Sequence, residues 1–388
     1  MSLVSTGDQQ LSQSYGLYSG VCLGGGFDGY VDAEMVRGSG ISHAAGLAAV
    51  TNGDVLRQGS VDLGESPYIA RAFIRWTHAL GGQALDTVAR AMDDIARVVP
   101  TARLEITAGR LASTDLFDLN RYANATRTQF LSWVLFQNGA WDYAANTRGY
   151  SNGLAFAWIH PSWTLRAGVF QMPRRANGNA FDDDLSQARG ENVEFTVNAP
   201  HGAIVRLLAY LNYARMGRYA YADSVGAAGH VTPDIVADDA PGRTKGGLGL
   251  NAELPLDDDG ETGVFARLGW SDGRNESFAF TEVDRHLSAG VQVAGSRWGR
   301  TRDRLGIALA VDGISGGHSA YLAAGGQGFL LGDGTLRYGA EVLAEGYYRA
   351  QLGPWIEVSP DVQFIVNPGY NRDRGPATVL TLRFNARY

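Results

Sequence analysis

The feature that most constrains the fold of this chain is a segment of about ten residues in which apolar and polar side chains alternate. The last of these segments shows the pattern most clearly, because Leu380, Leu382 and Phe384 alternate with Thr381 and Arg383. Successive side chains of a β-strand point to opposite faces. Each such segment therefore predicts a strand with one apolar and one polar face.

Fifteen segments of this kind recur along the chain, and the connections between them alternate between short and long. An antiparallel sheet places the short turns at one end and the long loops at the other. We expect the long loops at 39–68, 111–152, 173–189, 214–241, 274–284, 312–336 and 367–376. The segments are 17–25, 27–38, 69–79, 101–110, 153–159, 163–172, 192–198, 203–213, 244–254, 263–273, 285–294, 304–311, 337–350, 355–366 and 377–388.

Two architectures compete for such strands. Each segment taken alone favours a half-buried strand of a soluble sandwich. The whole set, with alternating loop lengths and aromatic residues near strand ends, instead favours an all-β, transmembrane, antiparallel up-and-down β-barrel with its apolar face toward lipid. We expect one barrel domain over residues 1–388. The aromatic residues are Trp163, Trp270, Tyr348, Trp355 and Tyr388.

The number of strands follows from the positions of the chain ends. Bacterial outer-membrane barrels have an even number of strands, and both termini usually lie on the periplasmic side. We therefore expect a sixteenth strand near Val4 to Gln13. The first residues, 1–16, lack the basic and apolar regions of a secretory signal peptide, so we expect any export signal to have been removed before this numbering begins.

One connection on the short-turn side is longer than the others and carries a different pattern. Its apolar residues recur at intervals of three and four, which is typical of one face of a helix. We expect a short periplasmic helix here, and a core helix of a soluble domain is the alternative. The residues of this stripe are Leu85, Val88, Met92, Ile95 and Val99.

The composition excludes several classes of function. Lys245 is the only lysine among 33 basic residues, and the net charge is -7, so a basic face for nucleic acid is not expected. The single cysteine, Cys22, cannot form an internal disulfide. The seven histidines are scattered without zinc-ligand spacing, and no nucleophile or phosphate-binding motif occurs. We expect no cofactor, no metal and no enzymatic activity.

In a barrel, the polar face of the strands would line a water-filled lumen. Some strands carry arginine on this face and others carry carboxylates. Opposed guanidinium and carboxylate groups hydrogen-bond hydroxyls in fixed directions, which suits neutral, hydroxyl-rich solutes. The alternative is that these charges pair only for structure. The residues are Arg71, Arg75, Arg103, Arg166, Arg267, Glu341, Glu345, Glu357 and Asp361.

The loop at 111–152 is long and rich in aromatic residues. A loop of this length is usually ordered by packing against something. Folding into the lumen would supply that surface and narrow the pore, with the aromatic rings forming a sugar-binding eyelet. A loop that packs only on itself is the alternative. The aromatic residues are Phe117, Tyr122, Phe130, Trp133, Phe136, Trp141 and Tyr143.

Two motifs resemble those of a known family. The stretch GRLASTDLFDLN at 109–120 leads into the aromatic loop, and PDVQFIVNPGYN at 360–371 precedes the last strand. Both are similar to the carbohydrate-selective porins of the OprB type, and the resemblance runs from about 68 to 388. It implies a sixteen-stranded barrel in the outer membrane of a Gram-negative bacterium. Such barrels pass mono- and oligosaccharides by diffusion, and as channels they also conduct ions.

The resemblance also implies residues and partners. The family's charged strand faces and its D-x-F-D-x-N loop place the constriction at particular positions of this sequence. We expect sugars as solutes, outer-membrane lipid around the barrel, and a homotrimer or a monomer. The positions are Arg71, Arg75, Arg103, Glu105, Arg110, Asp115, Asp118 and Asn120.

These observations give one leading hypothesis and two rivals. The leading hypothesis is a passive outer-membrane pore for sugars with an Arg/Glu-lined constriction. One rival is a barrel hydrolase at the outer rim that recruits His286 or His318, although no family signature of such an enzyme is present. The other is an export pore for a secreted polysaccharide, which an arginine lining would serve if the polymer were anionic.

Overall fold

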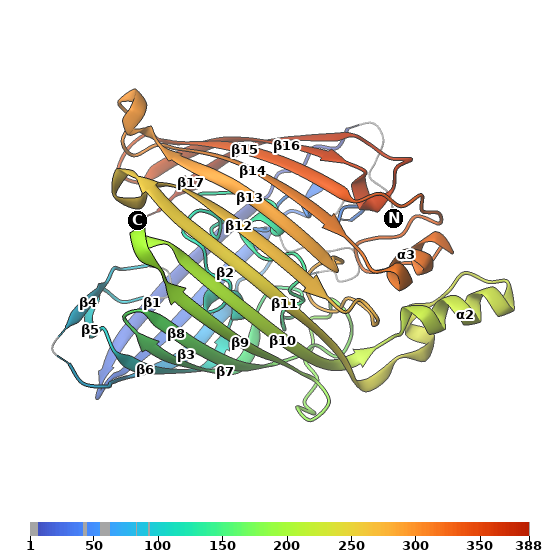
Figure 1. Ribbon diagram of the computed structural model, residues 1–388, viewed down its shortest axis with the longest axis horizontal. Helices are drawn as coiled ribbons and strands as arrows, with labels where there is room; N and C mark the ends of the chain where they lie inside the picture. Colours follow the sequence, from blue (N-terminus) through green and yellow to red (C-terminus); the bar gives the residue numbers. More distant parts are fainter. Residues whose placement is uncertain (1–6, 42–44, 55–62, 83, 92–93, 388) are drawn as a thin grey trace.

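The computed structural model describes residues 7–41, 45–54, 63–82, 84–91 and 94–387. Fifteen strands form one antiparallel sheet in which spatial neighbours are also neighbours in sequence, and the sheet curves around a central space (Figure 1). All fifteen strands correspond to the segments expected from alternation. They are β1 (Gln13–Gly24), β2 (Phe27–Arg37), β3 (Tyr68–Ala79), β6 (Arg103–Leu111), β7 (Ser151–His160), β8 (Trp163–Gln171), β9 (Arg189–Asn198), β10 (Ile204–Met216), β11 (Ala240–Asp257), β12 (Thr262–Ser271), β13 (Arg285–Ala294), β14 (Arg304–Gly313), β15 (Glu341–Gln351), β16 (Ile356–Val366) and β17 (Ala377–Ala386).

The burial of side chains along the strands is the reverse of that in a water-soluble sheet. On β16 four of the five buried side chains are polar, with Glu357 and Asp361 almost inaccessible, whereas Val362 and Phe364 are exposed. On β17 Leu380 is 78% exposed. An apolar outer face with a polar inner face is the arrangement of a transmembrane barrel, in which lipid contacts the outside. The expected fold class is confirmed.

The two ends of the barrel differ (Figure 1). The short turns, the C-terminus and a small hairpin lie at one end, and the long loops lie at the other. Two helices, α2 (Tyr219–Gly229) and α3 (Gly316–Ala323), project from the long-loop end, and α1 (Trp133–Phe136) is a single turn within the longest loop. Among the described residues, no helix has the length and apolar character needed to cross a membrane.

The sixteenth strand expected near Val4 to Gln13 is not observed in the described part of that segment. Residues 7–12 are not in a strand, Gln13 is the first residue of β1, and residues 1–6 lie outside the described part. In an antiparallel sheet of fifteen strands the first and last run in the same direction. Within the described residues, β1 and β17 are therefore the two edges of the sheet and do not pair with each other.

Residues 126–129, which lie between β6 and β7, approach both edge strands from inside the barrel. Arg127 contacts the hydroxyl of Tyr18 on β1. Arg383 on β17 donates hydrogen bonds to the carbonyl oxygens of Thr126 and Gln129, the latter at 2.9 Å. The segment 126–129 thus connects the two edges without a strand-to-strand ladder.

The expected periplasmic helix is wrong. The connection instead forms a two-stranded hairpin of β4 (Leu85–Val88) and β5 (Arg97–Pro100). A helix would have needed a surface to cover its whole apolar stripe. Of that stripe, only Val99 is buried, Leu85 is exposed, and Met92 lies outside the described residues. The hairpin is held to the barrel by charge instead, through Arg97 with Asp28 on β2 and through Asp94 with Arg75 on β3.

Candidate functional site

The chain between β6 and β7 lies inside the barrel, where its backbone amides meet inward-facing carboxylates of the wall. The N–H of Asp118 donates to Glu194 on β9 at 2.7 Å, and the N–H of Arg121 donates to Glu253 on β11 at 2.8 Å. On the other side of the lumen, Ser132 donates to Glu345 on β15 at 3.0 Å. The inward loop, residues 112–150, is therefore fixed to three separate strands. A carboxylate that accepts backbone N–H groups makes a charge-assisted, directional bond.

Arg267 on β12 is the most completely engaged of these wall residues. Its side chain is fully buried, and its guanidinium donates to the carbonyl oxygens of Leu135 (2.7 Å), Ala123 (2.8 Å) and Asp118 (3.1 Å). Its Nε lies 3.0 Å from the carboxylate of Asp118. Five donors in a rigid fork suit a site that must gather several acceptors from one turning segment. Arg267 therefore organises the turn of the inward loop.

The loop also needs room to approach the wall closely, and glycine provides it on β12. A Cβ added at Gly269 would lie 2.0 Å from Oδ1 of Asn138. Asn138 donates from its side chain to the carbonyl oxygen of Leu268 at 2.8 Å. A larger residue at 269 would thus displace the loop from β12.

Two glutamates of β15 serve as acceptors for loop backbone rather than as free charges of a channel. Glu341 accepts the N–H groups of Ala49 (2.6 Å), Ala48 (3.1 Å) and Gly369 (2.6 Å). Glu345 accepts the backbone N–H of Ser132 and is a diagonal neighbour of Asp361 on β16. These carboxylates hold three different segments against one wall.

Beside the inward loop an open cavity of about 180 Å³ remains. It lies between the start of that loop, the inner face of β3, β6, β7 and β8, and the hairpin β4–β5. Most of its lining is charged or polar, and a few apolar side chains complete it. The lining residues are Arg75, Val88, Asp94, Arg97, Arg103, Glu105, Thr107, Asp115, Leu116, Leu119, Ala155, Phe156, Ala157, Ile159 and Arg166.

The charged groups around the cavity are held by one another. Nε of Arg103 donates to Glu105 at 2.7 Å. Nη1 of Arg166 lies 3.7 Å from Glu194. Asp115, at the start of the inward loop, is bound by Arg71 on β3 through two parallel bonds of 2.7 and 2.8 Å. Such bidentate pairs fix geometry as well as charge, so the cavity has a preformed polar wall.

The fourteen residues expected at the constriction fall into separate groups. Arg75, Arg103, Glu105, Asp115 and Arg166 line the cavity. Arg110 is placed elsewhere, because its guanidinium lies over the rings of Tyr150 and Phe181. The residues that bind the inward loop or other lumen groups are Arg71, Asp118, Asn120, Arg267, Glu341, Glu345 and Asp361, and Glu357 pairs with Arg387 at 2.8 Å.

The aromatic rings of the inward loop do not form an open eyelet. The ring of Trp133 stacks on Phe280 with centroids 4.2 Å apart, and Tyr143 packs on the same ring at 4.3 Å. Phe117 packs against Trp141 at 6.3 Å. All of these rings are buried. The loop therefore does not pack only on itself, because it binds the barrel wall and stacks on Phe280, but other rings cover the ring faces that a sugar would need.

Several groups that shape the site were not anticipated from the sequence. Asp94 and Arg97 on the hairpin line the cavity, and Glu194 and Glu253 bind the loop. The sequence pattern could have identified the two glutamates, since they occupy the polar face of alternating segments. It could not have identified the hairpin residues, because their role depends on how that connection folds.

One polar cluster on the inner wall has the bonding pattern of a hydrolase triad. Nε2 of His286 lies 2.9 Å from Oγ of Ser288, and Nδ1 lies 2.7 Å from Asp312. All three side chains are buried. The inward loop covers them, since a Cβ added at Gly139 would lie 3.1 Å from Nδ1 of His286. A nucleophile needs room for a substrate carbonyl and donors for its oxyanion. We interpret the cluster as structural.

Comparisons with known proteins agree with this architecture. The model of the family described as carbohydrate-selective porin, OprB family, matches residues 68–388. The high-pH structure of OprB from Pseudomonas putida is similar, with a TM-score of 0.72 and 16% identity over 99% of this chain and 90% of that chain. The low-pH structure of the same protein gives a TM-score of 0.48 and 13% identity over 97% and 85%. OmpF of Salmonella typhi in complex with daunomycin gives 0.49 and 10% over 98% and 93%. No curated protein sequence matches this chain.

A barrel with an apolar outer face, a polar lumen and a long loop bound inside it defines a porin, a channel of the bacterial outer membrane. The family match covers most of the chain and includes the inward loop and the cavity wall. The chain belongs to the OprB family of carbohydrate-selective porins.

Proposed function

We propose that this porin passes mono- and oligosaccharides by diffusion through the cavity between the inward loop and the wall of β3, β6, β7 and β8. The observation that carries the proposal is the open, charge-lined cavity beside the packed inward loop. Guanidinium groups donate hydrogen bonds and carboxylates accept them, so a sugar hydroxyl finds both kinds of partner along one wall. The narrowest part of the path is then the ring of residues that line this cavity.

The balance of charge favours neutral solutes over anionic polymers. Four arginines line the cavity, and three carboxylates, Asp94, Glu105 and Asp115, stand beside them. Two of the arginines are paired further with carboxylates of the wall, Arg97 with Asp28 and Arg166 with Glu194. Little net positive charge remains to attract a polyanion. This supports sugar diffusion over export of an anionic polysaccharide.

The protein acts as a channel rather than as an enzyme, and we propose that it has no hydrolase activity. The His286 cluster is sealed by the inward loop. His318, the other histidine considered, lies between Glu282 and Asp284 at 3.6 and 3.3 Å, and no serine among the described residues is bonded to its ring. Both histidines thus have structural partners in place of a substrate.

Liposome swelling tests the proposal directly. Purified barrel is reconstituted into liposomes, which are diluted into isotonic solutions of a neutral monosaccharide, a disaccharide or a trisaccharide. We expect swelling for the smaller sugars, with a rate that falls steeply as size increases. Liposomes without protein are the control. A folded barrel that gives no sugar-dependent swelling would contradict the proposal.

Ionic solutes separate the two channel hypotheses. If the cavity passes neutral sugars, a neutral sugar and a sugar carboxylate of equal size should enter at similar rates in high salt, where surface charge is screened. Strong preference for an anionic oligosaccharide at both low and high salt would instead support the polysaccharide-export function.

A further inference from the structure

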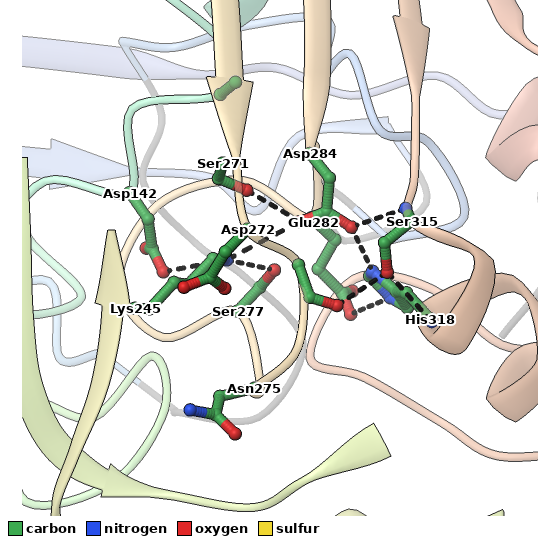
Figure 2. Close-up of polar contacts among 12 residues, drawn as sticks. Asp142, Lys245, Ser271, Asp272, Asn275, Ser277, Glu282, Asp284, Ser315 and His318 are labelled. Carbon is green, nitrogen blue, oxygen red and sulfur yellow. Dashed lines mark hydrogen bonds and ion pairs between the residues drawn. The ribbon is translucent and has the colours of Figure 1, made fainter. Parts of the chain in front are cut away.

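The only lysine of the chain is completely buried. Lys245 lies on β11, and its side chain is inaccessible to solvent. Its ammonium nitrogen lies 3.0 Å from Oγ of Ser277, 3.2 Å from Asp142 and 3.9 Å from Asp284 (Figure 2). Every other basic residue of the sequence is an arginine. A buried charge is retained only with close partners, so the position of this ammonium is set by three neighbours on two different segments.

The shape of the ammonium explains why lysine occupies this site. An ammonium offers three donors from one compact atom, whereas a guanidinium is a planar fork that needs more room. Three oxygen-bearing side chains surround Nζ here, from the inward loop and from the segment between β12 and β13. The site therefore matches lysine in both charge and geometry.

Asp142 connects this ammonium to the packing of the pore. Its carboxylate accepts the backbone N–H groups of Phe278 (2.9 Å), Ala279 (2.7 Å) and Phe280 (3.2 Å). The ring of Phe280 in turn stacks on Trp133 of the inward loop. One buried carboxylate thus fastens the inward loop to the segment 272–284, and Lys245 supplies its counter-charge.

The same network continues toward the long-loop end. Asp284 accepts Oγ–H of Ser271 at 2.9 Å and the N–H of Ser315 at 2.8 Å, and it lies 3.3 Å from Nδ1 of His318 (Figure 2). The His318 ring stacks on Tyr219 of α2 with centroids 4.2 Å apart. Segments from four long loops therefore share one chain of ion pairs and hydrogen bonds.

Loss of the ammonium would leave two carboxylates buried near each other with fewer partners. A buried pair is costly to break on one side, because the remaining charge stays desolvated without compensation. Of the segments in this network, the inward loop can move, because apart from its two ends it is joined to the barrel only by ion pairs, hydrogen bonds and packing contacts. Its displacement would change the space beside it, which is the proposed pore.

We propose that Lys245 is a positioning residue for permeation, which holds the inward loop through Asp142 and thereby fixes the aperture of the pore. The inference rests on the proposed function, because an aperture has meaning only for a solute that passes. Lys245 itself does not line the cavity. Its effect on permeation is therefore exerted entirely through the loop.

The test compares four forms of the folded barrel in liposomes: wild type, Lys245→Met, Asp142→Asn and the double variant. We expect Lys245→Met to raise the entry rate of a trisaccharide relative to a monosaccharide several-fold. The double variant should return toward the wild-type ratio, because position 142 then carries no charge without a counter-charge, and Asp284 keeps its contacts with Ser271, Ser315 and His318. Arg297→Met is the matched control, since it breaks an exposed ion pair with Asp257 at a short turn.

The outcomes separate this inference from the proposed function. If wild type admits no sugar, the proposed function fails. If wild type admits sugar and folded Lys245→Met keeps its size limit, with no added fluctuation of single-channel current, the positioning role is wrong. A double variant as leaky as Lys245→Met would also overturn it, since the effect would then come from lost packing rather than from an unpaired charge.

Wild-type protein decides the question if Lys245→Met does not fold. Reductive methylation modifies amines that solvent reaches, and this chain offers only Lys245 and the terminal amine. We expect Lys245 to stay unmodified in conducting barrels and to react fully after denaturation. Rapid methylation in barrels that keep the wild-type size limit would contradict a fixed loop.

Discussion

Two sides of the same lumen use similar residues in different ways. On the side of β3, β6, β7 and β8, Arg75, Arg103 and Arg166 face an open cavity. On the side of β12 to β15, Arg267 and Glu345 are covered by the inward loop and bond to its backbone. Both sets lie on the polar face of alternating strands. The position of the loop decides which of them faces the cavity and which serves as an anchor.

This difference indicates how the pore is built. The anchor side, formed by β12 to β15, supplies acceptors and donors for backbone groups of the loop. Without them these groups would be buried without partners, which costs a large amount of folding free energy. The cavity side is left with charges that pair mainly with one another. A substitution on the anchor side should therefore act on loop order and stability first, and one on the cavity side should act on permeation first.

The largest expected effect is on the anchor side. Arg267→Met removes the buried counter-charge of the Asp118 carboxylate and one donor to each of three loop carbonyl oxygens, so we expect a loss of about 3–5 kcal/mol in unfolding free energy. Arg166→Met on the cavity side is the comparison, and it should cost much less, since that guanidinium is 22% exposed and 3.7 Å from its carboxylate. Urea unfolding of the two variants in detergent, followed by tryptophan fluorescence, measures both. Equal losses would remove the distinction between the two sides.

The next effect is on the cavity side. Replacing Arg75, Arg103 and Arg166 together with alanine removes three long side chains and three positive charges from the cavity wall. We expect higher single-channel conductance and a shift of the reversal potential toward cation preference, with the barrel still folded. Planar-bilayer recording in a salt gradient measures both quantities. Unchanged conductance would place the narrowest part of the pore elsewhere.

A smaller effect should appear in the pH dependence of stability. Burial lowers the pKa of His318, but the carboxylates of Asp284 and Glu282, which lie 3.3 and 3.6 Å from its ring nitrogens, raise it above its usual value. The folded state therefore holds this proton more tightly than the unfolded state, and the stabilisation is present below about pH 6.5 and lost as pH rises through the folded pKa. Melting temperature measured across this range should fall by a few degrees, and His318→Gln should flatten the curve.

At acid pH, stability depends on Asp284, the carboxylate beside His318. Although burial raises the pKa of Asp284, the contacts with His318 and Lys245 hold it below its usual range. Its stabilisation is present above its unfolded pKa and is lost only as pH falls through the lower folded value. A melting temperature that rises from neutral to alkaline pH in wild type would contradict the sign for His318, and one that rises as pH falls below about 4 would contradict the sign for Asp284.

For Ser288, the last residue compared, we expect no hydrolase chemistry and therefore no effect of its replacement. Ser288 has a histidine and an aspartate in triad order but is buried beneath the inward loop. A fluorophosphonate probe should not label it in the folded barrel, and hydrolysis of phospholipid or ester substrates should be unchanged in Ser288→Ala. Labelling that is lost in this variant would revive the hydrolase hypothesis.

Much of the fold could be predicted from the sequence because strand parity is a local property. All fifteen strands follow from alternation, and Arg75, Arg103 and Arg166 follow from their inward parity. The connection at 85–99 could not be predicted this way. Its spacing suits a helix, but its fold depends on two ion pairs with distant strands, including Asp94 with Arg75.

The split between lining and anchoring residues could not be predicted either. Glu105 and Glu345 both lie on the polar face of a segment with alternating side chains, and only the path of the inward loop distinguishes their roles. The role of Asp142 had no local signal, because its partners Lys245 and Phe280 lie more than a hundred residues away in the sequence. Such contacts belong to the packed loop, whose course is set by the whole barrel.

Accessibility of introduced cysteines tests the central claim most directly. In a Cys22→Ser background, Thr107→Cys places a thiol on the cavity wall, and Ser288→Cys places one beneath the inward loop. We predict that a small thiol reagent reduces the conductance of Thr107→Cys channels, that sugar slows this reaction, and that Ser288→Cys channels are unaffected. Block at position 288 with none at position 107 would contradict a solute path along the arginine-lined wall.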